Sequence, residues 1–322
     1  MQRTLGILGL LAMAGSGAEA LAQEWPAKPI RFIAPNLPGG PTDILARLIG
    51  QKLAETLGQP VVIENRAGAA GNIGTEVAAK APPDGYTLVT GNNATFGANV
   101  SLYKRLGFDP VKDFTPIVLA ATQPNILVVH PSLPVTSIKE LIALAKARPG
   151  QLNYSGSGMG AAAHLAAELF KSMTATNIVH IPYKSAAPAL TDLMAGETQL
   201  MFATSLSVIQ HIKANRVRAL GVTTAKRSRF LPELPTMAEA GVPGFEASTW
   251  HGVLVPAGTP GAIVERLNME INRMLQLADV RERLAAMGAE VVGGSAKEFA
   301  DHIQREIPKW AKVVKAIGVQ LE

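Results

Sequence analysis

The sequence predicts an α/β protein of two lobes, each with a βαβ-type sheet flanked by helices. Short apolar runs that suit buried strands alternate with helical apolar spacing between residues 30 and 95. A second series of the same kind begins near residue 126. The chain has 322 residues, 48% of them hydrophobic, which is enough for two medium-sized domains. Short crossovers that each carry a helix indicate parallel strands and right-handed βαβ units.

Residues 1–22 have the pattern of a secretory signal peptide. One basic residue precedes an apolar segment at residues 5–13, and an A-x-A cleavage site ends at Ala22. The apolar segment is too short to span a bilayer. The absence of cysteine excludes disulfides, a cysteine nucleophile, zinc thiolate sites and a lipid anchor on an N-terminal cysteine. We therefore expect a periplasmic protein without a lipid anchor.

A strand is expected at residues 30–34 and an amphipathic helix at residues 41–57. Gly40 suits the N-cap, Pro41 the first helical position, and Asp43 the first turn, where the helix dipole favours a carboxylate. Free amides of the glycines before the helix and of its first turn would form an anion site without Lys or Arg. An ordinary tight βα connection is the alternative, and this stretch alone favours it.

Two further strands of the first lobe are expected at residues 61–64 and 86–90, with a helix at residues 72–81 between them. The third strand leads into a polar loop that contains Asn92 and Asn93. Because the carboxyl ends of parallel strands share one edge of a sheet, this loop and the loop after the first strand are expected to be neighbours.

The second lobe is expected to repeat this arrangement. Its strands are predicted at residues 126–129, 151–155, 178–181, 200–203 and 217–222. Residues 101–124, which lack a regular pattern, and the long loop at residues 224–249 are interpreted as the two passages between the lobes. We therefore assign residues 23–123 and 224–322 to the first lobe and residues 124–223 to the second.

Several helices have clear end signals. Ser137 and Glu140 form a predicted capping box, in which each side chain satisfies a backbone amide of the first turn. Ser295 and Glu298 form another at the start of a terminal helix. Pro308 is expected to kink or break that helix.

Residues 156–161 fit the pattern G-x-G-x-x-A between a strand and a helix, which is typical of dinucleotide sites. Such a site also needs an acidic residue about twenty positions later, where this chain has Thr174, Thr176 and Asn177 and no carboxylate. We therefore expect no nucleotide or other cofactor. The helix amides, together with the hydroxyls of Ser155 and Ser157, suit a small anion instead.

Neither a metal site nor a catalytic site is indicated. The six histidines show no H-E-x-x-H or similar close spacing, and no G-x-S-x-G motif is present. His164 shares a helix face with Glu168 and is more often an ordinary first-turn residue than a catalyst. An exported hydrolase that uses His164 with Ser155 or Ser157 is the rival reading, disfavoured because an orienting acid is missing too. Tyr183 either covers a ligand or packs in the core.

The net charge of +5 is modest, and its densest basic cluster lies at residues 226–229 in a loop-like region. A solvated loop explains this cluster best, because an exported protein meets no nucleic acid. We therefore expect no nucleic-acid partner.

A set of short motifs occurs in a fixed order along the chain: Lys28-Pro29-Ile30-Arg31, Pro38-Gly39-Gly40 with Asp43, Pro83-Asp84-Gly85-Tyr86, Pro182-Tyr183-Lys184, and Pro256-Ala257-Gly258-Thr259-Pro260. Together they resemble the solute-binding proteins of tripartite tricarboxylate transporters, the Bug-type receptors. The resemblance covers nearly the whole mature chain. It implies a Venus-flytrap receptor of the type II periplasmic binding fold that serves a membrane permease and catalyses nothing. A receptor that feeds a sensor kinase is the alternative, and we expect a monomer.

The resemblance also implies that loops of both lobes hold a carboxylate, largely through backbone groups, small hydroxyls and waters. By position, the predicted ligand-binding residues are Asn36, Leu37, Gly39, Gly40, Thr42, Asp43, Asn92, Asn93, Ser155, Ser157, Gly158, Gly160, Ala161, His164, Tyr183 and Thr204. Two departures stand out. Asn36-Leu37 replaces a frequent aromatic, and Ala203-Thr204 replaces a frequent Asp-Asn pair. The lost carboxylate disfavours an aminated ligand, so a non-amino carboxylate is expected.

Overall fold

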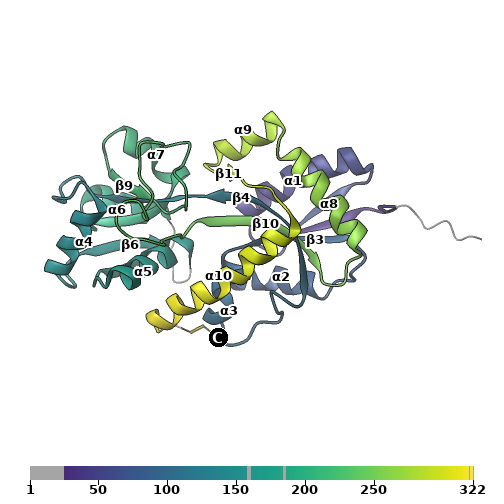
Figure 1. Cartoon of the computed structure of the whole chain (residues 1–322), viewed down its shortest axis with the longest axis horizontal. Helices are drawn as coiled ribbons and strands as arrows, with labels where there is room; N and C mark the ends of the chain where they lie inside the picture. Colours follow the sequence, from purple (N-terminus) through teal and green to yellow (C-terminus); the bar gives the residue numbers. More distant parts are fainter. Residues whose placement is uncertain (1–24, 158–160, 184–185, 319, 322) are drawn as a thin grey trace, which may run out of the picture.

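The computed structural model describes residues 25–157, 161–183, 186–318 and 320–321. The predicted signal peptide and the predicted site residues Gly158 and Gly160 lie outside the described residues. Two lobes lie side by side, each with one sheet between helices (Figure 1). This arrangement confirms the predicted fold class. Across the described ranges, no helix combines the length and the apolar character needed to cross a membrane.

The first lobe holds a sheet with the strand order β11-β4-β10-β3-β1-β2. The strands are β1 (Ile30–Ala34), β2 (Val61–Asn65), β3 (Thr87–Asn92), β4 (Phe114–Gln123), β10 (Thr249–Pro256) and β11 (Glu290–Val291). As predicted, β1 pairs in parallel with both β2 and β3, whereas β10 runs antiparallel to β3 and β4. The carboxyl ends of β1, β2 and β3 and the amino end of β10 therefore meet at one edge of the sheet.

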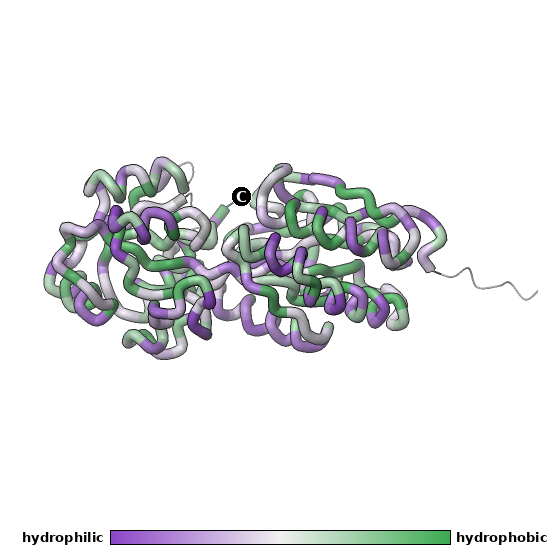
Figure 2. The backbone as a smooth tube through the Cα atoms, turned by 90° about the horizontal axis from the view of Figure 1, so that it is seen from above, coloured by the Kyte–Doolittle hydropathy of each residue, from purple (hydrophilic) through white to green (hydrophobic). Residues whose placement is uncertain are grey.

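Helices cover both faces of this sheet. They are α1 (Pro41–Leu57), α2 (Asn72–Ala79), α3 (Asn99–Leu102), α8 (Gly261–Met274), α9 (Ala278–Ala286) and α10 (Ala296–Ile317), with short turns at η1 (Ala69–Gly71) and η2 (Ala94–Ala98). Phe32 packs with Leu45 of α1 and Leu267 of α8 on one face, while Ile33 packs with Phe299 of α10 on the other. Both faces of β1 are buried, which explains its nearly continuous apolar sequence. Figure 2 shows hydrophobic segments inside each lobe.

The second lobe holds a sheet with the strand order β7-β6-β8-β5-β9. The elements are β5 (Asn125–Val129), β6 (Asn153–Ser157), β7 (Val179–Tyr183), β8 (Leu200–Thr204), β9 (Arg218–Val222), α4 (Ile138–Ala147), α5 (Ala162–Thr174), α6 (Ala186–Ala195) and α7 (Ser205–Lys213). β6 runs parallel to β7 and β8, and β5 runs antiparallel to β8 and β9. α4 and α5 pack on one face and α6 and α7 on the other.

The expectation of an irregular segment at residues 101–124 is wrong for its second half, which forms β4. Pro116 interrupts the apolar pattern there and obscures the strand in the sequence. β4 pairs with β10 along its length, but with β11 only at Ala121 and Thr122. Within the described chain, Pro116 therefore lies where β4 has a single neighbouring strand, and its missing N–H is tolerated.

α10 runs through Pro308 as one helix, so of the two expected effects of this proline, a kink or a break, the break does not occur. An interior proline costs a helix about 3 kcal/mol, because one backbone hydrogen bond is lost and the ring crowds the preceding turn. Burial of Phe299 and Trp310 on either side of the proline outweighs this penalty. The predicted capping box of Ser295 and Glu298 is present.

The C-terminal half of α10 connects the two lobes. Trp310 packs in the core of the second lobe, although the helix begins on the sheet of the first. The buried carboxylate of Glu306 accepts hydrogen bonds from the indole of Trp250 at 3.0 Å and from that of Trp310 at 2.7 Å, and it forms an ion pair with Lys309. Because Trp250 lies at the start of β10, Glu306 fixes α10 to a strand that enters from the passage between the lobes.

Candidate ligand-binding site

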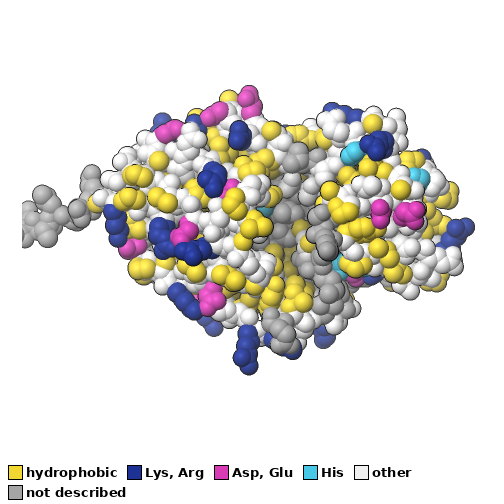
Figure 3. All heavy atoms as spheres, turned by 180° about the vertical axis from the view of Figure 1, so that it is seen from behind, with side chains coloured by type: hydrophobic (Ala, Val, Ile, Leu, Met, Phe, Trp, Pro, Cys, Tyr) yellow, Lys and Arg dark blue, Asp and Glu magenta, His cyan; other side chains and the backbone are white. Residues whose placement is uncertain are grey.

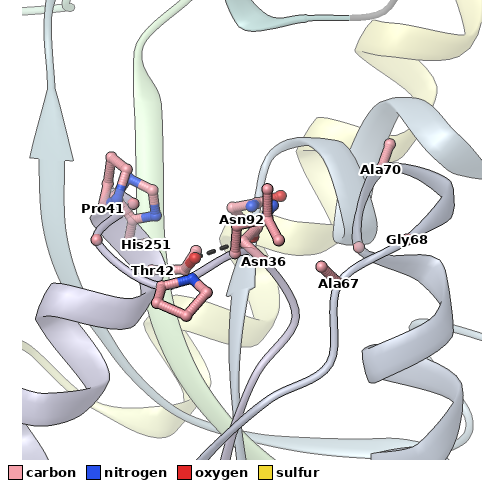
Figure 4. A pocket seen from close by; sticks show the side chains of 13 residues that line it. Asn36, Pro41, Thr42, Ala67, Gly68, Ala70, Asn92 and His251 are labelled. Carbon is pink, nitrogen blue, oxygen red and sulfur yellow. Dashed lines mark hydrogen bonds between the residues drawn. The ribbon is translucent and has the colours of Figure 1, made fainter.

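The loop between β1 and α1 forms one wall of a cavity of about 660 Å³ at the edge where β1 and β3 end. The loop after β2 forms the opposite wall (Figure 4). The lining residues are Asn36, Leu37, Pro38, Gly39, Gly40, Pro41, Thr42, Ala67, Gly68, Ala70, Gly71, Asn92 and His251. Six predicted site residues are therefore brought together. Among these described lining residues there is no Lys, Arg, Asp or Glu.

Asp43 lies behind the cavity wall and organises the loop. It is 2% exposed, and its carboxylate accepts hydrogen bonds from the amide of Gly39 at 2.9 Å, from Asn65 at 2.9 Å and from Arg47 at 3.0 Å. Burial would raise the pKa of Asp43, but the bonds from Arg47, Gly39 and Asn65 outweigh burial and hold that pKa below its usual value. The expectation that the amides of Gly39 and Gly40 are free is wrong, because Gly39 donates to Asp43 and Gly40 donates to the carbonyl of Leu37 at 3.4 Å.

The first turn of α1 keeps two amides available. Its N-cap, Gly40, has no side chain to accept them, and Pro41 has no N–H. Ile44 already donates to the carbonyl of Gly40. The amides of Thr42 and Asp43 consequently have no acceptor among the described residues, and they stand at the positive end of a 17-residue helix. This geometry suits the carboxylate of a ligand.

Two asparagine side chains line the cavity, and their hydrogen bonds show which way each side-chain amide is turned. The hydroxyl of Thr42 donates to Oδ1 of Asn36 at 2.9 Å (Figure 4). Oδ1 of Asn92 accepts the amides of Ala94 and Thr95 at 2.9 and 3.1 Å. Because the oxygen of Asn92 is the acceptor, its Nδ2 group remains as a hydrogen-bond donor at the cavity.

His251 also lines the cavity, and no motif in the sequence pointed to it. It lies near the start of β10, in register opposite Asn92 of β3. The side chain is 6% exposed, and neither ring nitrogen has a hydrogen-bond partner within the described chain. Burial lowers the pKa of His251 to about 4, so the ring is neutral at pH 7. The one signal in the sequence is its place directly after the long loop that returns from the second lobe.

The remaining predicted residues do not line this cavity. Asn93 is buried beside it, and Thr204, Ser155, Ala161 and the backbone of Ser157 belong to the second lobe. The hydroxyl of Thr204 contacts the hydroxyl of Ser207 at 3.1 Å. The hydroxyl of Tyr183 donates to Asp192 at 2.6 Å, and this bond is the main cause that raises the pKa of Tyr183 to about 12.

Ser155 and His164 lie on opposite faces of the second sheet. Tyr154 packs toward α5 and lies 6.5 Å from His164 between ring centroids. Ser155, the next residue of β6, pairs with Met201, which belongs to the core under α6 and α7. Successive strand residues point to opposite faces, so the Ser155 hydroxyl and the His164 imidazole are separated by the sheet.

A groove runs between the lobes on the face shown in Figure 3, and the Lys, Arg, Asp and Glu side chains lie mainly outside it. Within the described ranges, no group of three or more His, Cys, Asp or Glu residues is placed to hold a metal ion. The site is therefore built from neutral donors and apolar surface.

Two lobes, with a cavity of neutral donors at the end of a helix, define a solute-binding protein. Residues 45–319 match the tripartite tricarboxylate transporter family receptor, and the chain belongs to that family, which confirms the resemblance to Bug-type receptors. It is 40% identical over 324 residues to the protein BugT of Bordetella pertussis, covering 100% of this chain and 99% of BugT.

Solved structures agree with this assignment. An R. palustris protein with adipate has a TM-score of 0.76 and 43% identity, covering 92% of this chain and 99% of that protein. MatC of Rhodopseudomonas palustris with bound malate has a TM-score of 0.72 and 34% identity, covering 90% of this chain and 100% of MatC. The family consists of solute-binding receptors rather than enzymes.

Proposed function

We propose that this protein is a periplasmic receptor that captures a small organic carboxylate between its lobes and delivers it to a tripartite tricarboxylate-type membrane transporter. The observation that carries the proposal is the set of neutral donors at one cavity, above all the amide of Thr42, which lines it, followed in the first turn of α1 by the amide of Asp43. A carboxylate there would gain oriented hydrogen bonds and the field of the helix dipole. Complexes of relatives with adipate and malate support the ligand class.

The two lobes have different roles in the proposed binding. The first, residues 23–123 and 224–322, supplies the donors, and residues 124–223 supply the closing surface with Ser155, His164, Tyr183 and Thr204. Leu37 is 72% exposed at the cavity rim, which suits a side chain that packs against a ligand or the facing lobe once the groove closes. Closure would exclude water and strengthen every polar contact inside.

Catalysis is not part of the proposal. A hydrolase would need a serine within hydrogen-bond reach of a histidine. Ser155 and His164 lie on opposite faces of their sheet, which argues against that pair. The family relationship supports the same conclusion.

A calorimetric and thermal-shift panel of mono-, di- and tricarboxylates tests the proposal. A ligand at a hundred times its dissociation constant should stabilise the fold by about 2.7 kcal/mol, which is a clear rise in the unfolding midpoint. The variant Thr42→Pro removes one of the two free amides within the first turn, where the missing N–H breaks no bond inside the helix. Thr42→Val is its control, because it keeps the amide and loses only the hydroxyl that donates to Asn36. We expect a shift with at least one carboxylate and a weaker one in Thr42→Pro. A broad panel without any shift would overturn the proposal.

A further inference from the structure

The start of β10 brings an unsatisfied histidine to the ligand cavity. His251 is directly opposite Asn92 in the antiparallel pair of β10 and β3, and both side chains line the cavity. Figure 4 shows the His251 ring across the cavity from the loop that contains Ala67 and Gly68, with the Asn92 side chain between them in the view.

The hydrogen-bonding state of these two residues points to a ligand group. His251 is 6% exposed, and both of its ring nitrogens lack a partner within the described chain. Buried polar side chains are nearly always hydrogen-bonded, to protein or to a bound molecule. Asn92 adds an Nδ2 donor, since its oxygen is already occupied by two backbone amides. His251 and Asn92 together therefore offer a ligand two hydrogen-bond donors and one acceptor.

The imidazole is suited to an oxygen group rather than to an apolar chain. A neutral ring presents one N–H donor and one acceptor nitrogen, which fits a carboxylate, a hydroxyl or a carbonyl oxygen. An aliphatic chain end against His251 would bury both nitrogens unpaired, and that is unfavourable.

The cavity has room for two polar groups joined by a chain. Its volume is about 660 Å³. A carboxylate takes roughly the space of two or three water molecules, each with about 30 Å³ of liquid volume. One carboxylate at the α1 amides therefore leaves most of the cavity for the rest of the ligand.

We propose that His251, assisted by the Nδ2 group of Asn92, binds a second oxygen-bearing group of the ligand and so selects bifunctional carboxylic acids over plain monocarboxylates. This inference rests on the proposed function, because it assumes that a carboxylate enters the same cavity. His251 is then a specificity-determining residue, and the recognised class comprises dicarboxylic and hydroxy acids.

The test compares chain-matched acids by titration calorimetry. The purified protein is titrated with adipate, 6-hydroxyhexanoate and hexanoate, and with succinate and butyrate. His251→Phe removes both ring nitrogens and keeps a ring, and His251→Gln keeps a donor and an acceptor. His302→Phe is the matched control, because His302 packs on Trp250, the residue before His251, at 5.1 Å between ring centroids, but does not line the cavity.

We expect the natural protein to bind the better dicarboxylate at least about ten-fold more tightly than its monocarboxylate partner. His251→Phe should bring this ratio close to one without weakening monocarboxylate binding, His251→Gln should retain most of it, and His302→Phe should leave it unchanged. The 6-hydroxyhexanoate titration separates recognition of a hydroxyl from recognition of a second carboxylate.

An unchanged ratio in His251→Phe, or equal binding of both acids by the natural protein, would overturn the inference while leaving the proposed function intact. Failure of every acid to bind would overturn both. A further outcome is that His251→Phe lowers the unfolding midpoint equally with every ligand and leaves the ratio of dicarboxylate to monocarboxylate affinity unchanged. That result would show that His251 is only a structural residue.

Discussion

The carboxylate of Asp43 accepts a hydrogen bond of 2.9 Å from the amide of Gly39, four residues earlier in the chain. This bond closes the loop onto the first turn of α1 and sets its shape before any ligand arrives. Pre-shaping of this kind lowers the entropic cost of binding, because the loop need not be ordered by the ligand.

Asp43→Asn should weaken carboxylate binding and reduce stability by about 1–2 kcal/mol, because a charge-assisted bond to Arg47 and one acceptor are lost. Calorimetry and urea denaturation measure the two effects. Asp84→Asn is the control, since Asp84 accepts the amide of Tyr86 at 3.0 Å in another turn. Full affinity in Asp43→Asn would show that the bond to Gly39 does not shape the site.

Gly39→Val should damage ligand binding far more than stability. Gly39 has a φ of +82°, and a Cβ added there would meet no atom within 4 Å, so the expected cost to the fold is backbone strain of about 1–2 kcal/mol. Because Gly39 lines the cavity, a branched side chain there would distort or fill the space that the ligand needs. Gly58→Val is the matched control: its φ is +68°, and its added Cβ also meets nothing, but it ends α1 away from the cavity. Unfolding of Gly39→Val under conditions where Gly58→Val folds would favour an ordinary βα connection.

Stability should fall as the pH drops below about 6.5. Burial holds the pKa values of His164 and His251 at about 4, below the ordinary value of 6.5 in the unfolded chain. The folded state binds fewer protons, so the stabilising contribution is complete above pH 6.5 and is lost progressively as the pH falls toward 4. Each residue accounts for a loss of about 2 kcal/mol at pH 5.

Urea denaturation at pH 7.5 and pH 5 measures this loss. His251→Phe should show a pH dependence smaller by about 2 kcal/mol than that of the natural protein, because one buried titrating group is gone. An identical dependence in the variant would mean that His251 is already hydrated or protonated in the folded state.

Succinate should bind at least about ten-fold more tightly than aspartate, because the ammonium group of aspartate would be buried without a counter-ion. The described residues that line the cavity include no carboxylate, and Ala203-Thr204 supply none from the second lobe. Parallel calorimetric titrations decide this point. Tighter binding of aspartate or glutamate than of any plain carboxylate would contradict the expectation.

Much of the first wall of the site could be predicted from the sequence, because it depends on local rules. A glycine turn before Pro41 and a carboxylate at Asp43 specify the helix start, and the carboxyl ends of β1 and β3 bring Asn36 and Asn92 together. These local rules do not predict which backbone amides of the loop and of the first turn of α1 remain without an acceptor. Asp43 lies close enough to reach back to Gly39, as in other N-terminal capping arrangements, and that spacing was the available signal.

Other features depend on long-range topology. His251 reaches the cavity only because β10 returns from the second lobe and pairs antiparallel with β3. No local pattern encodes that pairing. The sequence of β6 predicts that Tyr154 and Ser155 point to opposite faces, but only the fold shows that α5 and His164 lie on the Tyr154 face. β4 was missed because Pro116 interrupts its apolar pattern.

A crystal structure of the protein with its tightest-binding carboxylate would show directly whether the first turn of α1 binds the ligand. We predict a ligand carboxylate oxygen at about 2.7–3.2 Å from the backbone nitrogen of Thr42 or Asp43, with residues of the second lobe closed over it. A carboxylate held instead by Lys or Arg side chains at another place on the protein would contradict the account.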